Sequence, residues 1–132
     1  MKYMLDTNIC IYAIKKDPSK VIANLNKHNP EDICISSITY AELMHGVEKS
    51  KANVRNLLAL TTFLTNIEIL DFNADASQCY GEFRSQLESE GTPIGPLDTL
   101  IAGHAKSLGY TLVTNNLKEF NRIKDLKTVN WI

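Results

Sequence analysis

The sequence lacks any apolar run long enough to cross a membrane, and it lacks paired cysteines. The apolar stretch after Lys2 ends at Asp6, so we expect neither a secretory signal nor a transmembrane segment. Cys10, Cys34 and Cys79 are odd in number, widely spaced and without a C-x-x-C pair. This pattern favours buried thiols in a cytoplasmic protein over disulfides or a zinc site.

Common catalytic signatures are also absent. The chain has no G-x-S-x-G motif, no phosphate-binding P-loop and no Rossmann glycine pattern. It has no internal repeat, no low-complexity segment and no composition shift that would mark a linker. With 132 residues, we expect one α/β domain over residues 1–132, long enough to bury a core.

Net charge gives little guidance, but its distribution gives more. The formal charge of −1 argues neither for nor against a nucleic-acid partner. Residues 104–132, however, carry five Lys or Arg against two Asp or Glu. This basic segment offers a surface for a polyanion, although a solvated C-terminal face is the simpler explanation on charge alone.

Apolar runs that suit buried strands alternate with segments of helical periodicity. We expect strands over residues 2–5, 33–36, 67–71 and 110–114, and a last edge strand over 129–132. We expect helices over residues 9–14, 19–25 (capped by Ser19), 37–47 (capped by Ser37 or Thr39), 54–64, 75–88, 97–108 and 116–120. This alternation predicts a mainly parallel sheet between two layers of helices.

Acidic and amide residues follow the expected strands. Asp6 ends the first strand, Glu42 lies in the first turns of the helix after the second, and Asp98 begins the helix after a Gly/Pro-rich loop. Asn116 and Glu119 follow the fourth strand. Carboxyl ends of parallel strands share one edge of a sheet. Carboxylates gathered there would repel one another, and a hard cation such as Mg²⁺ or Mn²⁺ would relieve that repulsion.

Each acidic residue also has a simpler explanation. Asp6 can cap the next helix, and Thr39-x-x-Glu42 matches a capping box. Asp98 can favour the dipole of its own helix. His104 lies six residues after Asp98 and therefore on a different face of that helix. For each acidic residue taken alone, the simpler explanation is preferable to a metal site. Jointly, the carboxylates favour a metal site.

Four motifs resemble the PIN-domain ribonucleases, and more narrowly the VapC toxins of toxin–antitoxin pairs. The similarity extends from Lys2 to Trp131. The motifs are Met4-Leu5-Asp6-Thr7-Asn8, Ser36-Ser37-Ile38-Thr39-Tyr40-Ala41-Glu42-Leu43, Gly95-Pro96-Leu97-Asp98-Thr99-Leu100-Ile101-Ala102 and Leu112-Val113-Thr114-Asn115-Asn116.

The resemblance implies a PIN-like α/β/α sandwich and Mg²⁺- or Mn²⁺-dependent endoribonuclease activity. It also implies inhibition by a VapB-type antitoxin and a homodimer. The Gly/Pro loop and Thr-Asn-Asn are similar to those of enteric toxins that cleave initiator tRNA, which implies a tRNA anticodon loop as substrate. Many PIN domains carry a further Asp where this chain has Asn116, and Glu119, one helical turn later, is positioned to replace it.

These considerations define a set of expected site residues. The expected catalytic residues are Asp6, Glu42, Asp98 and Glu119. The expected metal ligands are Asp6, Asp98 and Glu42, with Asn116 as a further candidate. The residues expected to orient these carboxylates are Thr7, Asn8, Ser37 and Thr114.

Three other functions remain open from the sequence. A haloacid-dehalogenase-type phosphatase would use Asp6 as nucleophile, but it requires a second Asp where this chain has Asn8. A receiver-like signalling domain would carry its acceptor Asp after a central strand. A PIN fold retained only for binding is the third alternative, because Asn116 is neutral.

The helices carry much apolar surface for a small sheet. We expect part of it to form a self-association or antitoxin groove, and the alternative is that all of it is core. The residues concerned are Ile9, Ile11, Tyr12, Leu57, Leu60, Phe63 and Leu64.

Overall fold

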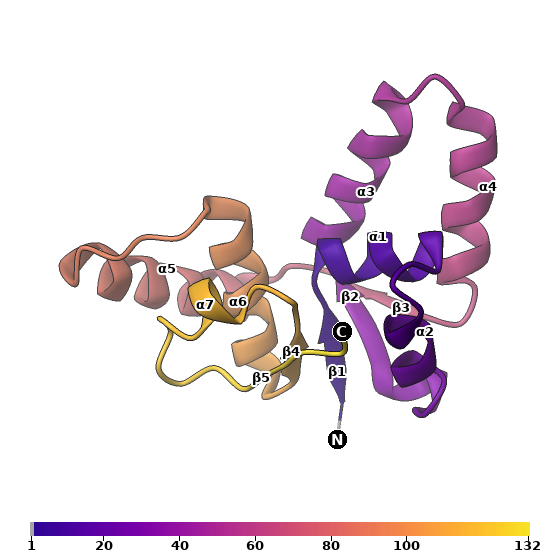
Figure 1. Ribbon diagram of the computed structural model, residues 1–132. Helices are drawn as coiled ribbons and strands as arrows, with labels where there is room; N and C mark the ends of the chain where they lie inside the picture. Colours follow the sequence, from indigo (N-terminus) through magenta and orange to yellow (C-terminus); the bar gives the residue numbers. More distant parts are fainter. Residues whose placement is uncertain (1) are drawn as a thin grey trace.

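A computed structural model describes residues 2–132 of the chain, and it contains a five-stranded parallel sheet at its centre (Figure 1). The strand order is β3-β2-β1-β4-β5, and every neighbouring pair is parallel. The strands are β1 (Tyr3–Leu5), β2 (Ile33–Ser36), β3 (Glu68–Leu70), β4 (Thr111–Val113) and β5 (Thr128–Val129).

Seven α-helices connect and cover these strands in the part of the chain that the structure describes. They are α1 (Thr7–Lys15), α2 (Ser19–Leu25), α3 (Ser37–Lys49), α4 (Asn53–Leu64), α5 (Ala74–Ser89), α6 (Pro96–Leu108) and α7 (Leu117–Phe120). A short 3₁₀ turn, Pro30–Asp32, precedes β2. Within residues 2–132, no helix combines the length and apolar character needed to cross a membrane.

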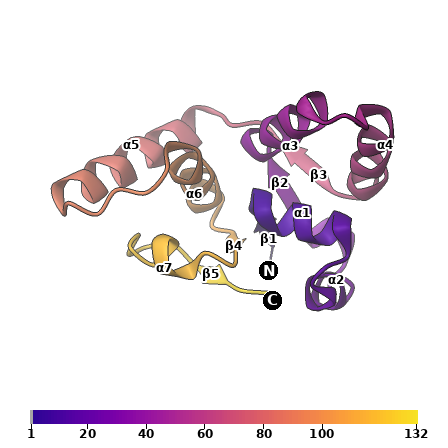
Figure 2. The same ribbon diagram turned by 45° about the horizontal axis from the view of Figure 1, so that its top comes forward.

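The helices lie on both faces of the sheet, as Figures 1 and 2 show. Successive strand residues point to opposite faces, so Met4 and Leu5 belong to different core clusters. Leu5 packs with residues of α1, α2, α3 and α4, whereas Met4 packs with residues of α5, α6 and α7. The predicted α/β/α sandwich with a parallel sheet is therefore confirmed.

Most element boundaries agree with the sequence to within two residues, but the predicted helix caps differ. Ser36, not Ser37 or Thr39, caps α3, because β2 runs directly into the helix and the Ser36 hydroxyl accepts a hydrogen bond from Ile38 N–H at 3.0 Å. Pro18, not Ser19, stands at the cap of α2 and makes no side-chain cap bond.

The central strands bring three chain segments to one edge of the sheet. β1 pairs with β2 on one side and β4 on the other, with Leu5 opposite Val113. Asp6 N–H continues this ladder by donating to the Val113 carbonyl at 3.0 Å. The residues that follow β1, β2 and β4 are therefore neighbours in space, although they are far apart in the sequence.

Candidate active site

Asp6 lies at the end of β1 and is almost fully buried. One carboxylate oxygen accepts a hydrogen bond from Ile9 N–H at 2.9 Å, so the residue caps α1. Burial raises the pKa of this carboxyl group, hydrogen bonds from Thr114 and Ile9 lower it, and the charge of Glu42 raises it again. Asp6 is thus a helix cap and also a buried carboxylate beside a second acidic group.

Glu42 does not close the capping box that the local sequence suggested. Its carboxylate accepts a hydrogen bond from the Thr7 hydroxyl at 2.7 Å, across 35 residues of sequence. Thr39, the other half of that box, is fully buried and lies 3.4 Å from the same Thr7 hydroxyl. The start of α3 is already capped by Ser36, so Glu42 is directed to the start of α1, where Asp6 lies.

Asp98 lies in the first turn of α6, with Pro96 at the first helical position. Its pKa is raised to about 6, first by burial and then by the charges of Asp6, Glu42 and Glu119. These four carboxylates come from four separate segments, yet the other three act electrostatically on Asp98, and Glu42 acts on Asp6 as well. Asp98 therefore feels the charge of each of the other three acidic residues expected at this edge.

The segment after β4 is held by a short hydrogen-bond chain. The Thr114 hydroxyl accepts from Asn116 N–H at 2.9 Å, and the Asn116 side-chain amide donates to Glu119 at 3.1 Å. Arg122, three residues after Glu119, donates to the Pro93 carbonyl at 3.1 Å. Glu119 is therefore bonded to Asn116, and its charge acts on Asp98.

Two of the four residues expected to orient the carboxylates do contact them. Thr7 bonds to Glu42, and Thr114 bonds to Asp6. The Ser37 hydroxyl accepts a hydrogen bond from Phe72 N–H at 3.0 Å, so it is used to hold the segment after β3. Asn8 is exposed, and within residues 2–132 no hydrogen bond joins it to a carboxylate. In the part of the chain that the structure describes, Ser37 and Asn8 therefore make no hydrogen bond to the carboxylates that they were expected to orient.

Sequence reasoning missed two hydrogen bonds near this edge. Asn115 donates from its side chain to the Tyr12 hydroxyl at 3.3 Å, and His104 Nδ1 lies 2.8 Å from the Ser36 hydroxyl oxygen. The partners are 103 and 68 residues apart, so no local pattern links them. The only sequence signal for His104 is its position within the apolar stripe of α6.

The chemistry of these donors suits a hard divalent cation. All of them are carboxylate or amide oxygens. Burial raises the Asp98 pKa most, the charges of Asp6, Glu42 and Glu119 raise it further, and a bound cation would offset both effects. Among residues 2–132, no group of three or more His, Cys, Asp and Glu side chains forms a ready cage for a metal ion. Mg²⁺ is commonly held by one or two carboxylates and otherwise by water. The fit therefore rests on the chemistry of the donors.

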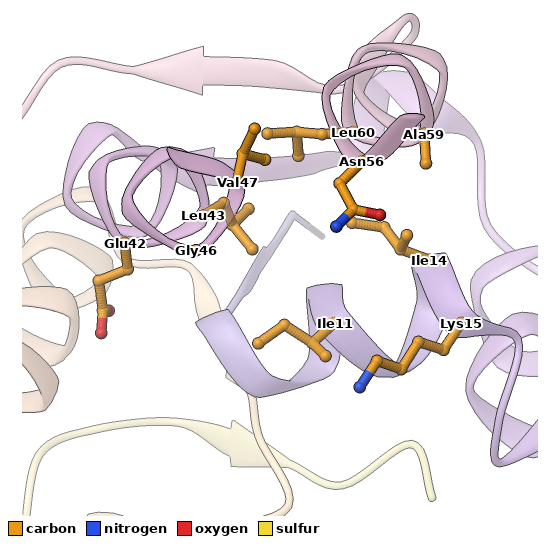
Figure 3. Close-up of a pocket in the computed structure, with 10 residues that line it drawn as sticks. All are labelled: Ile11, Ile14, Lys15, Glu42, Leu43, Gly46, Val47, Asn56, Ala59 and Leu60. Atoms are coloured by element: carbon orange, nitrogen blue, oxygen red, sulfur yellow. The ribbon is translucent and has the colours of Figure 1, made fainter. Parts of the chain in front are cut away.

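An apolar groove of about 250 Å³ begins beside Glu42 and runs between α1 and the α3–α4 pair (Figure 3). Glu42 marks one end, with its carboxylate turned away from the apolar side chains, and Lys15 lies on the opposite rim. The residues that line the groove are Ile11, Ile14, Lys15, Glu42, Leu43, Gly46, Val47, Asn56, Ala59 and Leu60.

Comparison with known proteins gives the family. The model of the PIN domain matches residues 3–126. The chain is 52% identical to "Ribonuclease VapC2" of Rickettsia felis and 46% identical to "tRNA(fMet)-specific endonuclease VapC" of Shigella flexneri. Each alignment covers 99% of this chain and 98% of the relative. The chain belongs to the VapC ribonucleases of the PIN-domain family.

Solved structures of VapC proteins agree with this assignment. The chain matches VapBC2 from Rickettsia felis, bound to a promoter DNA fragment, with a TM-score of 0.93 at 49% identity over 100% of both chains. It matches DNA-bound VapBC from Salmonella typhimurium with a TM-score of 0.94 at 45% identity over 100% of this chain and 99% of the other. The predicted VapC endoribonuclease toxin is thus confirmed, and the phosphatase and receiver-like alternatives are wrong.

Proposed function

We propose that this VapC ribonuclease is a Mg²⁺- or Mn²⁺-dependent enzyme that hydrolyses phosphodiester bonds in structured RNA, with initiator tRNA as its substrate. The observation that supports the proposal is the position of Asp98 at this edge, where burial and then the charges of Asp6, Glu42 and Glu119 raise its pKa to about 6. The tRNA assignment is supported by 46% identity to a relative named as a tRNA(fMet)-specific endonuclease.

Asp6 and Asp98 would hold the metal ion, and Glu42 would assist directly or through a water molecule. When bound, Mg²⁺ or Mn²⁺ offsets charge on the scissile phosphate and lowers the pKa of the attacking water. Thr7 fixes the orientation of Glu42 through its hydrogen bond. The Thr114 hydroxyl accepts from Asn116 N–H and donates to Asp6, so it ties the last motif to the first.

Basic side chains of the C-terminal segment would give the RNA an approach. Lys118 is exposed in α7, next to Glu119, and Lys124 is exposed shortly after that helix. Phosphate contacts of this kind supply affinity without sequence information. Sequence-specific recognition of RNA uses unstacked bases in loops, which fits an anticodon loop.

The proposal is tested by mapping the RNA ends that the enzyme creates. Purified protein is incubated with total RNA in Mg²⁺ or in excess chelator, and the new ends are sequenced. We expect ends concentrated in the anticodon loop of initiator tRNA, and only in the Mg²⁺ sample. Ends spread over many RNAs would overturn the tRNA assignment.

Glu119 is expected to act as a supporting acidic group at the position where Asn116 replaces the common Asp. Glu119→Gln should slow cleavage and raise the Mg²⁺ concentration needed for half-maximal rate, though less than Asp6→Asn does, because its charge acts on Asp98 from the edge of the cluster. Asn116→Asp should be tolerated when metal is present. The measurement is a Mg²⁺ titration of the cleavage rate. An unchanged titration curve for Glu119→Gln would leave a three-carboxylate site.

The apolar groove is our proposed docking site for an apolar helix of a VapB-type antitoxin. Two solved structures that the chain resembles are VapBC complexes. Helices commonly bind partners by laying an apolar face into such a groove. Of the apolar residues predicted to form a docking surface, Ile11 and the buried Leu60 line the groove, whereas Ile9 is core and does not line it. The family resemblance also favours a homodimer, which sedimentation would detect.

Ala59→Arg should weaken antitoxin binding by about tenfold or more, because it places a charge in an apolar interface. Cleavage of RNA by the toxin alone should be unchanged, since Ala59 is exposed on α4 and not among the site residues. Thr62→Arg adds the same charge to an exposed position of α4 outside the groove. Titration of labelled antitoxin measures both variants. Equal affinities for the two variants would place the antitoxin elsewhere.

A further inference from the structure

A buried hydrogen bond connects two helices that carry site carboxylates. Nδ1 of His104 lies 2.8 Å from the Ser36 hydroxyl oxygen. His104 is 1% exposed and Ser36 is 0% exposed, so water does not compete for this contact. A buried polar contact in an otherwise apolar layer is costly to break, because each partner would be left unsatisfied.

The two partners of this hydrogen bond lie on the elements that carry Glu42 and Asp98. Ser36 caps α3, and Glu42 lies six residues further along that helix. His104 lies in α6, six residues after Asp98. The bond therefore joins the helix that carries Glu42 to the helix that carries Asp98, at a comparable distance along the chain from each carboxylate.

α6 also packs closely against α5, and Phe72 packs against the His104 ring. A Cβ atom on Gly103 would lie 2.7 Å from the Tyr80 backbone nitrogen, so α5 and α6 touch backbone to backbone there. Phe72 packs edge-on to the His104 ring, with centroids 5.4 Å apart, and its own N–H donates to Ser37. α6 is thus held between α5 and the start of α3.

Hydrogen-bond roles follow from what Ser36 already does. Its hydroxyl oxygen accepts from Ile38 N–H at 3.0 Å, so its hydrogen is available to donate to Nδ1 of a neutral His104. Burial lowers the pKa of His104, although the charge of Asp71 partly offsets this effect. The ring is therefore neutral at neutral pH and accepts the Ser36 hydrogen.

We propose that His104 is a positioning residue for the ribonuclease reaction: by bonding to Ser36, it fixes α6 against α3 and so sets the separation of Asp98 from Glu42. This inference rests on the proposed function, because it assigns those two carboxylates to the metal site. His104 itself touches neither RNA nor metal. Misplacement of reacting groups by about 1 Å can cost roughly 100-fold in rate.

A matched pair of substitutions tests the bond separately from the packing. His104→Asn retains a hydrogen-bonding atom near the position of Nδ1, whereas His104→Leu has a similar branched shape and none. The leucine variant should bind Mn²⁺ more weakly, as counted by the electron paramagnetic resonance of free Mn²⁺. Its kcat should fall by about tenfold or more with little change in KM for tRNA. The asparagine variant should recover most of both losses.

Two results would overturn the inference: wild-type Mn²⁺ binding and cleavage in the folded leucine variant, or equal losses in both variants. If the leucine variant does not fold, Ser36→Ala removes the bond from its other end, with Ser37→Ala as the matched control for a lost hydroxyl at the start of α3. Equal behaviour of the two alanine variants would then contradict the inference. Asp98→Asn serves as the reference for the site itself. If the wild-type protein does not bind Mn²⁺, or if Asp98→Asn binds it as tightly as the wild type does, the proposed metal site itself is wrong, and not only the role of His104.

Discussion

Asp98→Asn should abolish RNA cleavage while making the metal-free protein more stable. Asparagine retains the size of the side chain but removes the charge that three other carboxylates oppose. Since catalysis depends in our account on that charge, we expect a loss of at least about 100-fold in cleavage rate. Asp6→Asn should have a similar effect on activity, because an asparagine oxygen can still cap α1 but carries no charge.

The gain in stability has a defined pH dependence. Asp98 titrates at about 6 in the folded protein and near its ordinary value of 3.8 when unfolded, so the folded state binds more protons between these values. The carboxylate therefore costs no stability below pH 3.8, and its full cost is present above pH 6. One pKa unit corresponds to about 1.4 kcal/mol, so we expect Asp98→Asn to add roughly 1–3 kcal/mol at pH 7 in chelator.

Thermal unfolding in chelator at pH 7 and pH 4 measures this difference, with Asp125→Asn as a control that changes an exposed carboxylate outside the site. The control should cleave RNA at the wild-type rate and show no stabilisation. Added Mg²⁺ should stabilise the wild-type protein and not Asp98→Asn, since a ligand stabilises only the state that binds it. A cleaving Asp98→Asn variant would remove this residue from the proposed ligands.

Removing divalent metal is expected to stop cleavage completely. The proposed site offers only carboxylate and amide oxygens, which bind Mg²⁺ and Mn²⁺, and no group in it replaces the charge of the ion. Excess chelator should therefore reduce the rate to background, and added Mg²⁺ or Mn²⁺ should restore it. Because protons compete for Asp98, the metal concentration needed for half-maximal rate should rise as the pH falls below about 6.

This dependence is measured by titrating Mg²⁺ at several pH values with an RNA substrate. Full cleavage in excess chelator would contradict the metal mechanism outright. A metal requirement that does not change between pH 5 and pH 7 would contradict the assignment of Asp98 as a ligand, while leaving a metal-dependent enzyme. The two outcomes therefore separate the general mechanism from this one residue.

The sequence predicted the fold well because its signals are local. Short apolar runs ending at polar residues give buried strands, and the regular alternation with helical segments leaves few topologies besides a parallel sheet. The convergence of Asp6 and Asp98 follows from the same reasoning, since each comes after a strand or begins a helix at the carboxyl edge. These positions depend on chain direction and need no knowledge of side-chain contacts.

The side-chain contacts were less predictable because they join distant segments. Thr39-x-x-Glu42 has the local pattern of a capping box, yet Glu42 bonds to Thr7 across 35 residues, and Ser36 provides the cap. Likewise, Ser37 bonds to Phe72 and not to a carboxylate. A local motif states which bonds a residue can make, whereas the packing of α1 against α3 decides which bond forms.

The predicted apolar surface also shows that local pattern was predictable and that contacts between distant segments were not. Periodicity identified the apolar face of α4 correctly, but it did not distinguish the buried Leu60 from Leu57, which is 43% exposed. Leu60 faces Leu43 and Val47 of α3 across the groove, as Figure 3 shows. Part of the surface is therefore core and part lines the groove.

The proposed function requires that the carboxylates at the edge of the sheet hold a divalent metal. The most direct test is a crystal structure of the protein soaked in Mn²⁺, with anomalous scattering used to locate the ion. We expect an anomalous peak within bonding distance of the Asp6 and Asp98 carboxylates, and we expect Asp98→Asn to lose it. A peak elsewhere, or no peak in protein that cleaves RNA under the same conditions, would contradict it.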